Sequence, residues 1–364
     1  MPRFPKFRSK EKKLIDAGSI EDKAIIEAAN TIFNTKIPGK TVALLIITLL
    51  FAFFISFALG KYPITPFEII GSIFNAEAMD PRITIVLYNI RFPRIIVVML
   101  VGAALATAGA SYQGMFKNPL TSPDLLGASA GASLGACIAL LLNQGGVVVQ
   151  LAAFAGGMIA VGIAVWLNKF VNYDPILGLV LAGILVSTLF GSGMSLVKFM
   201  ADADDKLPTI TFWLMGSFAA IDKADLLRCL IPMAIGFVIL LSQSWKLNVL
   251  SFGDEEARTM GVNTKQTRLL VIFAATLITS VSVALAGVVG WIGLVIPHLA
   301  RAIVGPNYKV LLPTSMFVGA VYLLFVDDLA RLLVTVEIPI GILTAIMGVP
   351  FFVFIFKRNM KGWR

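Results

Sequence analysis

The chain has 364 residues, of which 58% are hydrophobic and 14% are charged, and its mean hydropathy is +0.88. Soluble domains carry about 25% charged and about 45–50% apolar residues, so this composition excludes a soluble protein. Apolar runs long enough to cross a bilayer recur from Thr41 onward. We predict an all-α, polytopic membrane protein with about ten transmembrane helices. The predicted spans are residues 41–60, 93–113, 125–142, 148–168, 176–197, 226–243, 269–288, 290–304, 310–330 and 339–356.

The formal net charge of +9 is explained by membrane orientation. If the N-terminus is cytoplasmic, the segments on that side of the predicted spans carry most of the 30 Lys and Arg residues. The positive-inside rule then predicts that both termini are cytoplasmic and that the number of spans is even. The charge therefore needs no nucleic-acid partner, and we expect none.

The spans are flanked by a cytoplasmic N-terminal extension, residues 1–40, and a cytoplasmic tail, residues 358–364. The extension is charged and lacks the apolar segment of a cleavable signal peptide. Ser19 and Asp22 begin a predicted amphipathic helix that reaches Phe33. We expect this helix to lie on the membrane surface or against a neighbouring subunit, with a regulatory role as the alternative.

Sites for nucleotide, metal or catalysis are not indicated. The segment Ile37–Thr41 resembles part of a phosphate-binding loop, but Asn34 stands where the motif needs its first glycine. Cys137 and Cys229 show neither a disulfide framework nor metal-ligand spacing. His298 is the only histidine, and we expect a packed or hydrogen-bonded helix residue. The chain is therefore not expected to be an enzyme or to hold a metal.

Two segments outside the membrane are predicted to be partly helical. Between the first two spans, Thr65, Pro66 and Glu68 form the start of a short helix with a capping box. Residues 201–218 combine an acidic loop with a semi-apolar stretch too short to span. Such pieces line a mouth or re-enter the membrane beside other protein.

Charged residues near the spans gather at the predicted outer surface. Arg91 and Arg94 begin the second span, and Asp327, Asp328 and Arg331 lie near the end of the ninth. These residues can anchor the helices or pair with one another inside the protein. Alternatively, the arginines form a basic docking rim for an acidic partner, because guanidinium groups bind carboxylates with two parallel hydrogen bonds.

The second and third spans are separated by a broken segment, within residues 112–136. Pro119 and Pro123 prevent one continuous helix, and Ser122 can cap the next one. Irregular backbone at membrane depth is tolerated where protein or a water-filled cavity surrounds it. The segment is either a gate in a transport path or a structural elbow.

A polar stretch, SFGDEEARTMGVNTKQTR, separates the sixth and seventh spans on the predicted cytoplasmic side. We predict two short helices at residues 251–266. In the first, Ser251 caps the helix and Asp254 completes the capping box, and Gly261 ends it. Asn263 begins the second. Such a helical knob indicates a contact for a soluble partner.

Several stretches in order along the chain resemble the FecCD-type permease family. They include RFPRIIVVMLVGAALATAGASYQGMFKNPLTSPDLLGASAGA, GDEEARTMGV, GVVGWIGLVIPHLARAIVGPNYKVLLPTS and EIPIGILTAIMGVPFFVFIF. The resemblance covers about residues 42–357 and leaves out the N-terminal extension. Members of this family are the transmembrane subunits of type II ABC importers for iron chelates, haem and vitamin B12.

The resemblance implies a ten-helix permease domain at residues 41–357 with the type II ABC importer permease fold. It also implies a homodimer with the path between subunits, which opens to one side at a time. Two cytoplasmic ABC ATPase subunits would bind ATP and Mg, and an extracytoplasmic binding protein would deliver the substrate. This chain itself would need no cofactor.

The resemblance also assigns residues to these contacts. The residues that would dock the binding protein are Arg91, Arg94 and Arg331. The residues that would couple to the ATPase are Gly253, Asp254, Glu255, Glu256, Ala257, Arg258 and Gly261. The cytoplasmic gate would contain Asn118, Pro119, Leu120, Asn172, Asp174 and Pro175.

Family frequency favours a ferric siderophore as the substrate, followed by haem, cobalamin and oxyanions such as molybdate. In this family the binding protein selects the ligand, so the permease sequence leaves these alternatives open, as it does a paralogue in place of an identical partner. An ATP-independent secondary transporter is the alternative from another class, although intramembrane carboxylates typical of ion coupling are few. A membrane scaffold would leave the broken helices and the knob unexplained.

Overall fold

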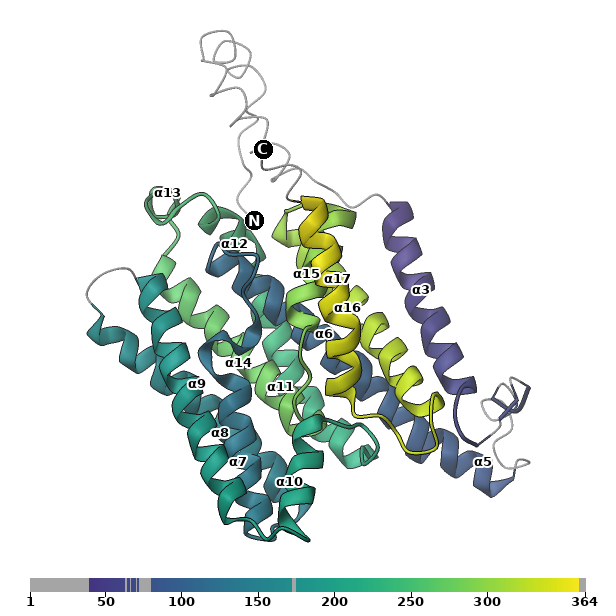
Figure 1. Cartoon of the computed structure of the whole chain (residues 1–364). Coiled ribbons are helices and arrows are strands. Elements are labelled where there is room, and N and C mark those ends of the chain that lie inside the picture. The colour runs from purple at the N-terminus through teal and green to yellow at the C-terminus, as the bar shows by residue number, and fades with distance from the viewer. Residues whose placement is uncertain are drawn as a thin grey trace.

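The computed structural model describes residues 39–62, 64–65, 67–69, 71, 80–171 and 175–359, and the regular structure in these ranges is entirely helical (Figure 1). The predicted amphipathic helix of the extension and the end of the tail lie outside the described residues.

Seven described helices are long and apolar enough to cross a membrane, and three shorter apolar helices, α7, α15 and α17, complete the predicted ten. The seven include one continuous helix, built from α5, η2 and α6, that is much longer than the span expected there. In chain order the spans are α3 (Gly39–Ala58), α5 (Pro81–Ile85) with η2 (Val86–Arg91) and α6 (Phe92–Met115), α7 (Ala128–Leu141), α8 (Gly146–Leu167), α9 (Pro175–Met200), α11 (Lys223–Ser242), α14 (Thr264–Ala286), α15 (Ile292–Val304), α16 (Tyr308–Leu332) and α17 (Ile340–Asn359).

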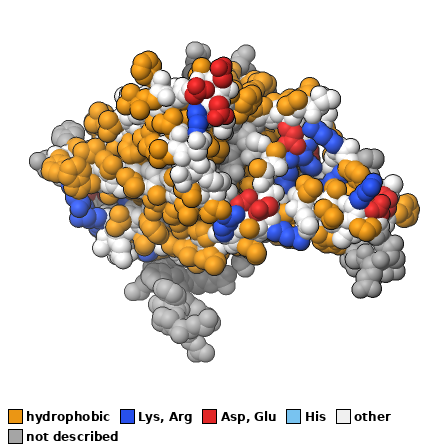
Figure 2. Space-filling view, turned by 90° about the horizontal axis from the view of Figure 1, so that it is seen from below, with side chains coloured by type: hydrophobic (Ala, Val, Ile, Leu, Met, Phe, Trp, Pro, Cys, Tyr) orange, Lys and Arg blue, Asp and Glu red, His pale blue; other side chains and the backbone are white. Residues whose placement is uncertain are grey.

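Short helices occupy the two ends of the bundle (Figure 1). One end carries α12 (Ser244–Leu250) and α13 (Asp254–Thr259), and we call it the α13 end. The opposite end carries α5 and α10 (Lys206–Met215), and we call it the α10 end. Figure 2 views the molecule from the α10 end, where charged side chains of both signs lie among hydrophobic ones. The remaining short elements are η3 (Pro123–Leu126) and η4 (Asn168–Phe170).

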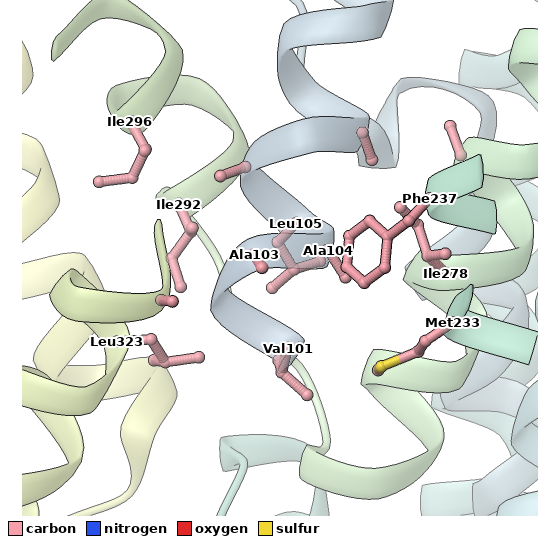
Figure 3. Close-up of a cluster of buried hydrophobic side chains, with 14 of the residues drawn as sticks. Val101, Ala103, Ala104, Leu105, Met233, Phe237, Ile278, Ile292, Ile296 and Leu323 are labelled. Carbon is pink, nitrogen blue, oxygen red and sulfur yellow. The ribbon is translucent and has the colours of Figure 1, made fainter. Parts of the chain in front are cut away.

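Helix α6 forms the centre of the bundle. Every residue from Val101 to Met115 is buried. Figure 3 shows its apolar side chains between α11 and α14 on one side and α15 and α16 on the other. Phe237 and Ile278 approach from the first pair, and Ile292 and Leu323 from the second. Because α6 is enclosed on all sides, its sequence is apolar around the whole helix rather than along one stripe.

Glycines allow α6 to approach its neighbours at backbone distance. A Cβ at Gly109 would lie 1.9 Å from the carbonyl oxygen of Gly293 on α15. A Cβ at Gly102 would lie 2.3 Å from the carbonyl oxygen of Gly319 on α16. Small residues at such crossings are typical of membrane helices, whose association in lipid depends on close packing.

The predicted helix start between the first two spans is confirmed. The backbone N–H and the hydroxyl of Thr65 both donate to the carboxylate of Glu68, at 2.7 and 2.8 Å, and the Glu68 N–H donates back to the Thr65 hydroxyl at 3.3 Å. In the acidic segment at residues 201–218, the stretch too short to span is helix α10, which packs its buried Ile210 against α7.

Candidate functional site

The break between α6 and α7 is present as predicted. After Met115 the chain turns at Lys117, whose φ of 50° is left-handed, and α7 begins at Ala128. Ser122 occupies the N-cap position of η3 with Pro123 first in the helix, as predicted, but its side chain makes no capping hydrogen bond. Instead, Asn118 Oδ1 accepts a hydrogen bond of 2.9 Å from the backbone N–H two residues later, which closes a tight turn. We call residues 116–122 the α6–α7 loop.

The only histidine of the chain contacts this loop. Nε2 of His298 lies 3.0 Å from the carbonyl oxygen of Pro119. Because a carbonyl can only accept, Nε2 carries the hydrogen in this bond. One turn along α15, Arg301 donates to Oε1 of Gln113 at 3.1 Å. The expectation of a hydrogen-bonded helix residue is confirmed, but the sequence did not indicate that its partner is a predicted gate residue.

The polar stretch after the sixth span begins differently from the prediction. The hydroxyl of Ser251 donates to the carbonyl of Asn248 at 2.6 Å, so it ends α12 and does not cap the next helix. Helix α13 starts at Asp254, after Gly253 with a φ of 143°. The predicted Ser251 cap is therefore wrong, because α12, a helix missing from the prediction, already uses its hydroxyl.

The end of α13 agrees with the prediction. Gly261 has a left-handed φ of 78°, and Asn263 Oδ1 accepts from the N–H of Gln266 at 3.0 Å. However, the helix that Asn263 starts is the spanning helix α14 itself, so a second short helix in this position is not formed. Helix α13 is thus joined directly to a span by a short turn.

Two charged contacts tie α13 to its surroundings. Asp254 Oδ1 accepts from the buried Arg268 of α14 at 2.7 Å and lies 3.8 Å from Nζ of Lys117 in the α6–α7 loop. Glu255 and Glu256 are exposed in the first turn, where the helix dipole favours negative charge. The predicted coupling residues and the predicted gate loop therefore lie side by side.

The second predicted gate segment lies at the start of α9. Asn172 and Asp174 are outside the described residues, and of Pro175 only its position at the start of α9 is described. In the α6–α7 loop, Asn118 and Leu120 are exposed.

The three predicted docking arginines lie at the α10 end and are buried, with exposed fractions of 4 to 6%. Arg94 donates to Asp327 and to Glu337, at 2.8 Å each. Arg331 pairs with Asp327 at 3.1 Å and also with Asp328. The alternative of Asp–Arg pairs inside the protein is thus what this structure contains.

The remaining contacts of this cluster link it to α3. Ser56 on α3 donates to Asp328 at 2.7 Å and accepts from Arg331 at 2.8 Å. Arg91 donates to the backbone carbonyls of Phe57 and Tyr62. We refer to Arg91, Arg94, Arg331 and their partners as the arginine cluster. Since its guanidinium groups already have internal partners, docking through them remains a prediction.

Glu337 is the most accessible carboxylate that pairs with Arg94, with 25% of its side chain exposed. Burial opposes its ionisation, but the hydrogen bond and charge of Arg94 and the charges of Lys61 and Arg331 outweigh burial. The pKa of Glu337 therefore lies below its ordinary value. The carboxylate is ionised at neutral pH and competes with any external anion for Arg94.

Asp327 is fully buried between two arginines, so we predict a large effect of its neutralisation. Asp327→Asn removes the carboxylate that Arg94 and Arg331 share, leaves them only Glu337 and Asp328, and so leaves one uncompensated positive charge in the buried cluster; it should lower the free energy of unfolding in detergent by about 3–5 kcal/mol. The exposed Asp204→Asn should change it by less than about 0.5 kcal/mol. Equal unfolding curves for both variants would contradict the importance of this pair.

Comparison with known proteins agrees with this architecture. The model of the FecCD transport family matches residues 48–358. The chain is 40% identical to the molybdate import system permease protein MolB of Haemophilus influenzae, over 85% of this chain and 93% of that protein. It is 35% identical to the Fe(3+)-citrate import system permease protein YfmE of Bacillus subtilis, over 90% and 97%.

A solved structure is also similar, with a TM-score of 0.81 and 37% identity over 88% of this chain and 100% of that one. It is described as an inward-facing conformation of a metal-chelate type ABC transporter. Both the sequence match and the helical arrangement extend over the whole bundle. The chain therefore belongs to the FecCD transport family and is a multi-pass ABC importer permease.

Proposed function

We propose that two copies of this chain form the translocation path of an ATP-driven importer for a ferric siderophore or a related iron chelate. The observation that carries the proposal is α13, a short polar helix at the end of the bundle whose acidic first turn is exposed. A separate ATPase subunit binds there, and its nucleotide cycle opens the path to one side at a time. This chain supplies the path and catalyses no covalent reaction.

The α13 end is the cytoplasmic end in this proposal. The first described residue, Gly39, and the end of α17 both lie at the α13 end (Figure 1). This arrangement supports an even number of spans with both termini cytoplasmic, as the distribution of Lys and Arg predicts. The binding protein then docks at the α10 end.

Helix α9 supports a path between two copies. Thr188, Ser192 and Ser195 are exposed on it at helical spacing, and each hydroxyl donates to the carbonyl of the residue four positions earlier. A hydroxyl bonded in this way tolerates an apolar surface but still offers lone pairs to a polar cargo. We assign this face to the path of a homodimer.

The contact with the ATPase predicts the effect of charge reversal on α13. Glu255→Lys combined with Glu256→Lys places positive charge where acidic residues are exposed, and should abolish recovery of the ATPase subunit with the tagged permease. Asp204→Lys with Asp205→Lys, a reversal of exposed charge at the α10 end, should leave recovery unchanged. Undiminished recovery with the first variant would contradict the assignment. Two copies with different tags, purified together, test the homodimer.

Docking of a binding protein at the arginine cluster requires an exchange of partners, because the cluster is internally paired. Removing an internal competitor should therefore strengthen docking. We expect Glu337→Gln to tighten binding of the purified binding protein by about tenfold, or about 1.4 kcal/mol. Asp204→Asn, which neutralises an exposed carboxylate outside the cluster, serves as the control. Equal affinities for the two variants would place docking elsewhere.

A specific observation favours molybdate as the second candidate, since the chain is 40% identical to MolB over most of both sequences. The proteins named for iron chelates, such as YfmE at 35%, support the first. The purified complex in liposomes, supplied with its co-purified binding protein and ATP, separates the two. Uptake of radioactive ferric siderophore is the expected result. Uptake of radioactive molybdate alone would replace it, and uptake that does not need ATP would favour a secondary transporter.

A further inference from the structure

The α6–α7 loop is held in an unfavourable backbone conformation. Lys117 is not a glycine, yet its φ of 50° lies in the left-handed region. Such residues persist where the surrounding structure determines the conformation, and they concentrate at functional and switch regions. The contact that accompanies this conformation is the ion pair of its Nζ with Asp254, at 3.8 Å.

Asp254 is fixed from a second side. Its Oδ1 also accepts from Arg268, whose guanidinium is buried at the start of α14. One carboxylate at the first residue of α13 thus joins this helix to both a spanning helix and the loop. A displacement of α13 moves the negative charge that faces Lys117.

The other side of the loop is attached to α15. Nε2 of His298 donates to the carbonyl of Pro119, and the imidazole ring packs edge-on against Phe352 of α17, with centroids 6.2 Å apart. The loop is therefore held at two points, one on α13 and one on α15. Asn118 lies between Lys117 and Pro119, and Leu120 follows directly.

We propose that Lys117 and His298 are positioning residues that hold the α6–α7 loop between α13 and α15, so that movement of α13 is passed to Asn118, Pro119 and Leu120. This inference rests on the proposed function, because the ATPase supplies the movement. A half-exposed ion pair with a separation of 3.8 Å adds little to stability, so Lys117 can be replaced without loss of the fold. His298 provides the fixed point against which the loop turns.

The test follows the loop directly and needs no transported substrate. Leu120, which is half exposed, is replaced by Cys, and its rate of reaction with a maleimide is measured in the complex with the ATPase. The native Cys137 and Cys229 are buried, and the chain without the new cysteine gives the background. We expect ATP with vanadate to change the rate of reaction with maleimide by about fivefold or more, because allosteric coupling between two sites usually amounts to at least about fivefold.

In this background, Lys117→Gln should abolish the change in rate while ATP hydrolysis continues, and Lys117→Arg should restore it. Lys309→Gln removes a charge from an exposed lysine at the same end and should leave the response intact. His298→Gln, which retains an N–H donor, should respond to nucleotide, whereas His298→Leu should not. The conservative variants separate positioning from a merely structural role.

The proposed transmission from α13 to the loop, which we call the relay, would be overturned by a full nucleotide response in Lys117→Gln or His298→Leu. It would also be overturned if nucleotide did not change the reaction rate of Leu120→Cys in the otherwise unchanged chain. If Lys117→Gln fails to assemble with the ATPase, the comparison of His298→Gln with His298→Leu tests the proposal in its place. The proposed function is judged separately, by ATP-dependent uptake in the unchanged complex. Uptake with an unresponsive loop would thus disprove the relay and retain the importer.

Discussion

The structure depends on the close packing of α6 against α15 and α16, in which the helix backbones are in direct contact. A helix in lipid gains little from hiding apolar surface, because the surrounding chains are equally apolar, so close contact must hold the bundle together. Gly102 and Gly109 provide this contact, at positions where any side chain would meet a neighbouring carbonyl. The other spans are arranged around this axis, and α3, with most of its residues accessible, is attached at one side (Figure 1).

Because α6 crosses the whole bundle, its two ends reach both predicted contact regions. Arg94 near one end enters the arginine cluster, and the loop after Met115 reaches α13 and α15 at the other. Packed membrane helices transmit displacement as rigid bodies more readily than they deform. Events at the two faces of the membrane can therefore influence each other through a single helix, with few intervening contacts.

The sequence predicted the features that depend on local chemistry. Hydropathy indicated the spans, two prolines indicated the break after α6, and Asn263 indicated a helix start, although that helix is the span α14 and not the short helix expected. Features that depend on distant partners were missed. Internal pairing of the arginines with Asp327 and Asp328 was left as one of two alternatives, and Glu337 was missed as a partner of Arg94, because 243 positions separate the two residues. The cap assigned to Ser251 failed for a local reason instead, because its hydroxyl donates to the carbonyl of Asn248 three residues earlier and so ends α12.

The bond between His298 and Pro119 has a practical consequence, because the chain contains one histidine. An isotope label in the imidazole ring would give a single set of magnetic resonance signals, free of overlap from other residues of this chain. The chemical shift of Nε2 depends on whether its hydrogen is donated to a carbonyl. The protein thus carries a built-in spectroscopic reporter at the loop between its second and third spans.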